Sequence, residues 1–170
     1  APVIVCGDVD PDWAADMLVT AKFYNAGQFC LSPSRFFVEA SIAERFTARF
    51  VARAQALRVG SGFAPESEMG PVASVRRLEA VQAMVEDARS LGARVLAGGQ
   101  RLGNRGYFYA PTVLDQVPDA AAVLNEEPFG PIAPILPFSD EAEMLARANR
   151  PEFGLASYVV TRDPVRQRRL

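Results

Sequence analysis

Cys30 is the residue of this sequence whose type and setting best suit covalent chemistry. It ends the segment NAGQFC, residues 25–30, in a chain that contains no histidine. A thiol attacks a carbonyl carbon only as the thiolate, and an ordinary thiol pKa of about 8.5 leaves most of it protonated at neutral pH. Imidazole is the usual activating base. If Cys30 is a nucleophile, a carboxylate, a backbone dipole or a bound cofactor must therefore activate it.

A second segment whose residues could take part in chemistry is EEPFGP, residues 126–131. An isolated acidic pair is usually an exposed surface feature, and we interpret Glu126 in that way. The prolines and the glycine around Phe129 predict a turn that leads into an apolar strand. Glu127 opens this turn, and its carboxylate can accept two hydrogen bonds.

Other titratable groups have simpler interpretations. Cys6 ends the apolar segment at residues 3–6, so we expect it to be a buried small hydrophobe. Cys6 and Cys30 provide no disulfide framework, and no Cys/His cluster has zinc-binding spacing. We expect the basic run RQRR, residues 166–169, to be a solvated helix face.

The elements that must position these residues alternate along the chain. Strands are predicted at residues 3–6, 35–40, 94–97, 107–114, 132–138 and 156–161. Helices are predicted after the capping residues Asp10, Ser41, Ser74 and Ser139, and they end near Tyr24, Leu57, Gly92 and Ala148. Connections of crossover length predict an α/β layered domain with a largely parallel sheet flanked by helices. Cys30 follows the first helix, so we expect it in a loop that faces a cleft.

Composition limits the class of protein. The chain has 170 residues, 49% of them hydrophobic, which suffices for one domain with a substantial core. Its formal net charge of −2 gives no reason to expect a nucleic acid or a membrane surface as partner. No apolar run approaches the roughly 18 residues that span a bilayer, and no signal-peptide pattern opens the chain. The expected location is the cytoplasm.

Several segments together resemble the aldehyde dehydrogenase superfamily and occur in the family's order across all 170 residues. They are NAGQFC followed by Arg35, MGP at residues 69–71 with the stretch 106–112, the turn EPFGP, and ANRPEFGLA at residues 148–156, which has Phe153 where the family has Tyr. These segments resemble most the succinate-semialdehyde dehydrogenase branch of the family. The resemblance implies that residues 1–170 are an incomplete, nucleophile-bearing catalytic domain. It also implies that the family's dinucleotide-binding domain, its Glu-Leu-Gly-Gly base, its oxyanion-hole asparagine and its assembly strand lie outside this sequence.

The resemblance also implies a role for individual residues. Cys30 would attack the aldehyde carbon, and the thiohemiacetal would become a thioester as NAD or NADP takes the hydride. Glu127 would accept hydrogen bonds from the nicotinamide-side ribose, and Phe129 would pack near the nicotinamide ring. Phe29 and Leu31 would line the substrate tunnel.

Two flanking residues carry further expectations. We expect Arg35 to hold the Cys30 loop by hydrogen bonds. The succinate-semialdehyde branch carries Arg directly before NAGQ, where it pairs with the substrate carboxylate, but this chain has Tyr24. We place Tyr24 in the substrate tunnel. A tyrosine supplies no charge and lacks the bidentate grip of a guanidinium, which predicts a preference for neutral aldehydes over a dicarboxylic semialdehyde.

Three interpretations of the function stay open. The first is an NAD(P)-dependent dehydrogenase that oxidises a small-molecule aldehyde and is a homo-oligomer at full length. The second is a truncated, non-catalytic paralogue that serves as a binding or assembly module, and the third is a CoA-acylating aldehyde dehydrogenase. The 170-residue chain alone is expected to be inactive, and its exposed apolar faces to favour self-association.

Overall fold

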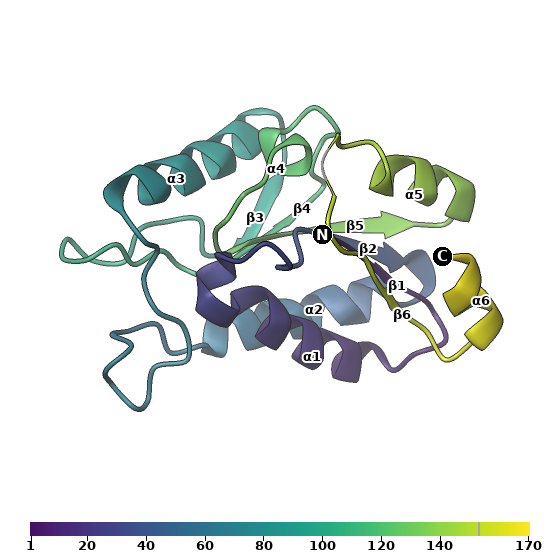
Figure 1. The fold of residues 1–170 in the computed structure, drawn as a ribbon, viewed down its shortest axis with the longest axis horizontal. Helices are drawn as coiled ribbons and strands as arrows, with labels where there is room; N and C mark the ends of the chain where they lie inside the picture. Colours follow the sequence, from purple (N-terminus) through teal and green to yellow (C-terminus); the bar gives the residue numbers. More distant parts are fainter. Residues whose placement is uncertain (153) are drawn as a thin grey trace.

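A six-stranded sheet forms the centre of the fold, as seen in a computed structural model that describes residues 1–152 and 154–170 (Figure 1). The strand order is β3-β4-β5-β2-β1-β6. β3 runs antiparallel to β4, and the other neighbouring pairs are parallel. The strands are β1 (Pro2–Val5), β2 (Arg35–Glu39), β3 (Arg94–Ala97), β4 (Thr112–Asp115), β5 (Ile132–Phe138) and β6 (Tyr158–Val160). This confirms the predicted α/β domain with a largely parallel sheet.

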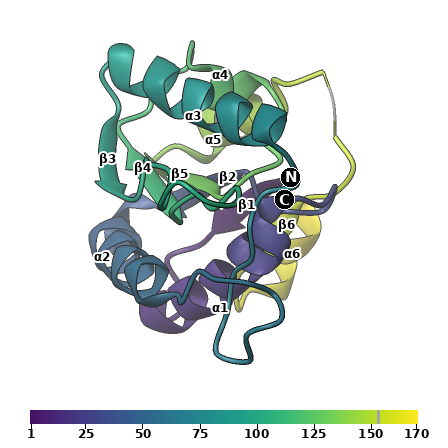
Figure 2. The same cartoon turned by 90° about the vertical axis from the view of Figure 1, so that its left-hand side faces the viewer.

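Helices cover both faces of the sheet (Figures 1 and 2). α1 and α2 lie on one face, whereas α3, α4 and α5 lie on the other, and α6 lies at the end of the sheet toward which β5 points. Within the described ranges, no helix is both long enough and apolar enough to cross a membrane. The helices are α1 (Pro11–Phe23), α2 (Ala40–Ala56), α3 (Val75–Ser90), α4 (Ala122–Asn125), α5 (Glu141–Ala148) and α6 (Pro164–Arg169).

Aromatic side chains join α1 and α2 to the sheet. The ring of Phe50 on α2 lies 5.1 Å from that of Phe36 on β2, and 6.2 Å from that of Phe23 on α1, measured between centroids. Phe46 and Ala54 are buried on the same stripe of α2. These side chains of α2 therefore belong to the core. Cys6, which directly follows β1, is also buried as predicted.

The helix starts confirm two predicted caps and correct two others. Asp10 accepts from the backbone of Asp12, and Ser74 from that of Arg77. Ser41 does not cap α2, which begins at Ala40 and has Glu39 at the capping position without a capping bond. The cap of α5 is Asp140 rather than Ser139, because the Asp140 carboxylate accepts from Glu143 N at 2.8 Å.

One predicted strand is too long, and one short helix was missed. The strand predicted at 107–114 begins only at Thr112, directly after Pro111, and Tyr109 makes just an isolated bridge with Arg101. Proline supplies no N–H to a strand ladder, which limits the strand on this side. α4 was not predicted, since four residues are too few to show a helical period.

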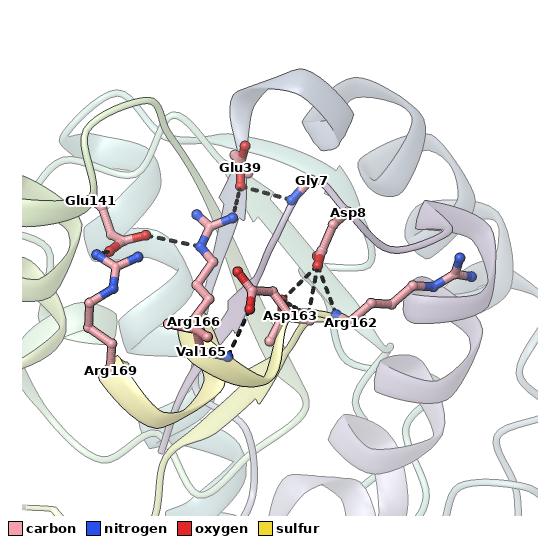
Figure 3. Close-up of polar contacts among 10 residues, drawn as sticks. Gly7, Asp8, Glu39, Glu141, Arg162, Asp163, Val165, Arg166 and Arg169 are labelled. Carbon is pink, nitrogen blue, oxygen red and sulfur yellow. Dashed lines mark hydrogen bonds and ion pairs between the residues drawn. The ribbon is translucent and has the colours of Figure 1, made fainter.

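A network of ion pairs fastens α6 to the carboxyl ends of the parallel strands (Figure 3). Arg166 lies between Glu39 at 2.8 Å and Glu141 at 3.0 Å. Its side chain is only 19% exposed, so the prediction of a solvated face is wrong for Arg166. Arg169 also pairs with Glu141, and Asp8 accepts from the backbone that leads into α6. The ends of β1, β2 and β5 are thereby tied to one helix.

Candidate active site

A pocket opens at the amino ends of the parallel strands. Cys30 comes before β2, Glu127 and Phe129 come before β5, and Leu155 comes before β6. Because parallel strands begin at the same edge of a sheet, these segments meet although they lie far apart in the sequence. Cys30, Phe29, Glu127 and Phe129 all line this pocket. Phe153, part of the predicted ANRPEFGLA motif, lies outside the described residues.

Two residues assigned to a substrate tunnel do not line the pocket. Tyr24 is 67% exposed and Leu31 is 43% exposed. The ring of Tyr24 packs edge-on against Phe29 with centroids 5.7 Å apart, and Tyr158 donates to the Leu31 carbonyl at 2.8 Å. Neither side chain lines this pocket, although Tyr24 contacts Phe29, which does. We define the Cys30 loop as residues 25–34.

The Cys30 loop begins with three successive residues in the left-handed conformation. The φ angles are 50° for Asn25, 53° for Ala26 and 71° for Gly27. Asn and Gly adopt this region readily, whereas Ala26 is strained there and is held by its buried surroundings. Asn25 and Gln28 stabilise the turn through reciprocal side-chain bonds of 3.1 and 3.0 Å to each other's carbonyl. The turn leaves the Cys30 side chain exposed.

Gln28 fastens the Cys30 loop to the segment that precedes α3. Its Oε1 accepts from Ala73 N at 2.7 Å, and its Nε2 donates to the Pro71 carbonyl at 3.3 Å. Both ends of the amide are thus occupied by backbone groups. Gln28 therefore stabilises the conformation of the loop.

Two glycines allow backbone contact between the Cys30 loop, α3 and the segment that we call the Phe129 turn, residues 126–131. A Cβ atom on Gly27 would lie 2.3 Å from the Gly130 carbonyl oxygen. A Cβ atom on Gly130 would lie 2.3 Å from the Val81 side chain of α3. No side chain fits at either place without movement of the backbone or of α3.

Arg35 does not hold the Cys30 loop, so that prediction is wrong. Its guanidinium donates to the carbonyls of Arg147 and Ala148, both at 3.1 Å. These carbonyls belong to the last turn of α5, where a cation satisfies acceptors that have no partner in the helix. Arg35 therefore binds the end of α5 rather than the Cys30 loop.

Lys22 lines the same pocket as Cys30, and sequence reasoning missed it. Its side chain is 1% exposed, and in the described parts of the chain it has neither a hydrogen-bond acceptor nor a carboxylate partner. Burial lowers the pKa of the Lys22 amine to about 7, because the charged form loses its hydration. A signal was present: Lys22 follows Leu18 and Val19 by four and three residues, which places it on the buried face of α1.

Lys22 should make folding stability depend on pH. The unfolded amine holds its proton up to a pH of about 10, whereas the folded amine releases it above about 7, so stability should rise between these values. We expect Lys22→Met to remove this rise and to increase stability at pH 7 by up to a few kcal/mol. Denaturant unfolding at several pH values measures both effects.

Lys22→Arg is the matched control, because a guanidinium keeps its charge throughout this range. It should lose the pH dependence and also be less stable at every pH. A Lys22→Met variant that retains the original slope would contradict the assignment.

The pocket combines groups suited to covalent chemistry on a carbonyl compound. It holds an exposed thiol, a carboxylate and an aromatic ring, from Cys30, Glu127 and Phe129. The other thiol, Cys6, is buried, and burial raises its pKa, so it is poorly suited to attack. In the described residues, no group of three or more His, Cys, Asp or Glu could hold a metal ion.

Comparison with known proteins gives one consistent match. The profile described as "Aldehyde dehydrogenase family" matches residues 1–170, the whole chain.

Curated relatives of high identity are named for different substrates. A 4-(hydroxymethyl)benzenesulfonate dehydrogenase of Comamonas testosteroni is 49% identical over 161 residues, 95% of this chain and 33% of the relative. A betaine aldehyde dehydrogenase of Cereibacter sphaeroides is 42% identical over 170 residues, 100% of this chain and 35% of the relative. A succinate-semialdehyde dehydrogenase of Paenarthrobacter nicotinovorans is 40% identical over 163 residues, 96% and 36% of the two chains. The chain thus spans about a third of the length of these relatives.

Solved structures agree with this match. An NADP-dependent enzyme of E. coli superposes with a TM-score of 0.95 at 39% identity, over 99% of this chain and 35% of the other. The NAD+ complex of an aldehyde dehydrogenase from Bacillus cereus gives a TM-score of 0.95 at 36% identity, over 99% and 34%.

Proposed function

The chain belongs to the aldehyde dehydrogenase family, and from this we propose that it forms part of the catalytic domain of an enzyme that oxidises an aldehyde to a carboxylic acid with NAD or NADP. The single observation that supports this most is the exposed Cys30 thiol in one pocket with Glu127 and Phe129. Because the chain spans about a third of its relatives, we also propose that it does not oxidise aldehydes by itself.

We assign the covalent step to Cys30. Its thiolate attacks the aldehyde carbon, a C–S bond forms, and the carbonyl π electrons move to the oxygen. The Cys30 backbone N–H is suited to donate to this oxygen. The carbon then loses a hydride, which carries two electrons, and the carbonyl re-forms as a thioester. Water attacks the thioester, the C–S bond breaks, and the acid leaves as the thiolate is regenerated.

The Phe129 turn fits the nicotinamide end of a dinucleotide. The Glu127 carboxylate is exposed and can accept hydrogen bonds from two neighbouring ribose hydroxyls. The half-buried Phe129 ring offers an apolar surface on the same pocket as Cys30. When bound, the cofactor supplies the hydride acceptor. The similar structures of an NADP-dependent enzyme and an NAD+ complex support both forms of the cofactor as candidates.

Trapping of the thioester tests this proposal directly. The whole protein is mixed with an aldehyde and NAD or NADP, quenched in acid and digested for mass spectrometry. We expect formation of reduced cofactor and an acyl group on the Cys30 peptide, with the Cys6 peptide unmodified. Acid formation without reduced cofactor, or acylation elsewhere, would refute the proposal.

We propose that neutral aldehydes are preferred over succinate semialdehyde, because Tyr24 supplies no positive charge beside Phe29. Tyr24→Arg should raise kcat/KM for succinate semialdehyde relative to a neutral aldehyde by about fivefold, the effect of a partly exposed ion pair. Steady-state kinetics on both aldehydes measure the ratio.

Tyr107→Arg adds the same charge at another exposed tyrosine and should leave the ratio unchanged. Tyr24→Phe, which removes only the hydroxyl, should also leave it nearly unchanged. A strong preference of the unaltered enzyme for succinate semialdehyde would contradict our inference about the substrate.

A further inference from the structure

We propose that Arg77 is a positioning residue for the cofactor: its guanidinium holds the Phe129 turn in the conformation that presents Glu127 and Phe129 to the pocket. The inference rests on the proposed function, since it concerns how this turn meets a nicotinamide dinucleotide. Neither the sequence motifs nor the predicted roles included Arg77.

Arg77 makes two contacts with the Phe129 turn. Its Nη1 donates to the Pro128 carbonyl at 3.3 Å. Its guanidinium carbon lies 5.9 Å from the centroid of the Phe129 ring, within the range of a cation–π contact. The two contacts fall on successive residues, so one side chain constrains both a peptide plane and the ring that follows it.

The conformation of the turn needs such support. Phe129 has a φ of 37°, in the left-handed region that bulky side chains rarely adopt. A residue keeps a strained conformation only where its surroundings enforce it. Val81 of α3, one helical turn beyond Arg77, leaves no room for a Cβ atom on Gly130. α3 therefore contacts the turn at Pro128, Phe129 and Gly130.

Helix stability does not explain Arg77. Arg76 and Arg77 both lie in the first turn of α3, which has no acidic residue. Cations at a helix N-terminus are unfavourable, because the peptide dipoles give that end a partial positive charge. Arg76 is exposed, whereas Arg77 is half-buried against the turn. This placement makes Arg76 a natural control for Arg77.

Arginine suits this role better than lysine. A guanidinium is planar and can donate a hydrogen bond while it stacks on a ring, whereas an ammonium is a point charge without a fixed plane. The same end of α3 follows the segment that holds Gln28 of the Cys30 loop. The start of α3 thus sets the position of the Phe129 turn relative to Cys30.

The test compares Arg77→Met, Arg77→Lys and Arg76→Met in the whole protein. The first readout is the Kd for the reduced cofactor, which is measured by cofactor fluorescence in the absence of aldehyde. We expect Arg77→Met to weaken binding about tenfold, Arg77→Lys about threefold, and Arg76→Met not measurably. The aldehyde KM and the rate of Cys30 labelling without cofactor should stay unchanged in all three.

A double-mutant cycle with Phe129→Leu tests the contact itself. If Arg77 acts through the ring, Arg77→Met should weaken cofactor binding less in the Phe129→Leu background than in the unaltered protein. If Arg77→Met weakens cofactor binding by the same factor in both backgrounds, or behaves like Arg76→Met, the inference is overturned.

Glu127→Ala distinguishes a failure of this inference from a failure of the proposed function. If it leaves the Kd unchanged, the proposed cofactor site itself fails, whereas a weakened Glu127→Ala with an unaffected Arg77→Met refutes only the role of Arg77.

Discussion

Replacement of Cys30 by serine is expected to lower aldehyde oxidation by the whole protein at least about a thousandfold. A hydroxyl ionises far less readily than a thiol, and the chain has no histidine to deprotonate it. Cys30 is exposed on the pocket, so serine should be accommodated without loss of folding. Reduced-cofactor formation at saturating aldehyde measures the effect, with circular dichroism as the check on folding.

Cys6→Ser is the matched control for this substitution. Cys6 is fully buried, so a hydroxyl there should cost about 1–3 kcal/mol of stability if it finds no acceptor. The folded fraction should nevertheless oxidise aldehydes at the normal rate. A Cys30→Ser variant with a tenth or more of normal activity would refute the assignment of Cys30 as nucleophile.

Replacement of Gly27 by alanine is expected to lower activity about a hundredfold, because it moves the Cys30 loop away from the Phe129 turn. The new methyl group would lie 2.3 Å from the Gly130 carbonyl oxygen, and a backbone atom cannot turn aside as a side chain can. The φ of +71° adds strain of about 1–2 kcal/mol for any residue with a Cβ atom. Activity and thermal stability should fall together.

Gly62→Ala provides the matched control. A Cβ atom on Gly62 would have no neighbour within 4 Å, and its φ is not in the positive range. This variant should keep normal activity and lose no stability. Gly27→Ala at normal activity would show that the close contact between loop and turn is not required.

The sequence predicts the loop positions of Cys30 and Glu127 because the signals for these loops are local. Gly27 after a helical period predicts a chain reversal, and the prolines around Phe129 predict a turn, so Cys30 and Glu127 were placed in loops before the strands were known. The apolar runs of β2 and β5 then put both loops at one edge of a parallel sheet. The pocket follows from these local facts together with the handedness and direction of the strands.

Side-chain contacts between residues far apart in the sequence could not be predicted from local signals. Glu39 occupies the capping position of α2, but its carboxylate binds Gly7 N and Arg166, which is 127 residues away along the chain. Arg35 is predicted to hold the Cys30 loop by hydrogen bonds, whereas its acceptors lie at the end of α5. A long arginine side chain can reach several acceptors, and sequence spacing does not indicate which of them it binds. The contacts of Arg77 with the Phe129 turn were not predicted for the same reason.

The ion pairs around Arg166 have a consequence for how this protein can change. They hold the strand ends opposite to the pocket, at a separation of roughly 13–20 Å for strands of this length. In open parallel sheets a ligand usually binds at the carboxyl ends, whereas here α6 is attached at that edge and Cys30 lies at the other. Effects of substitutions at sites so far apart tend to add independently. Substitutions beside Cys30 and substitutions around Arg166 should therefore change the stability of the fold independently of one another.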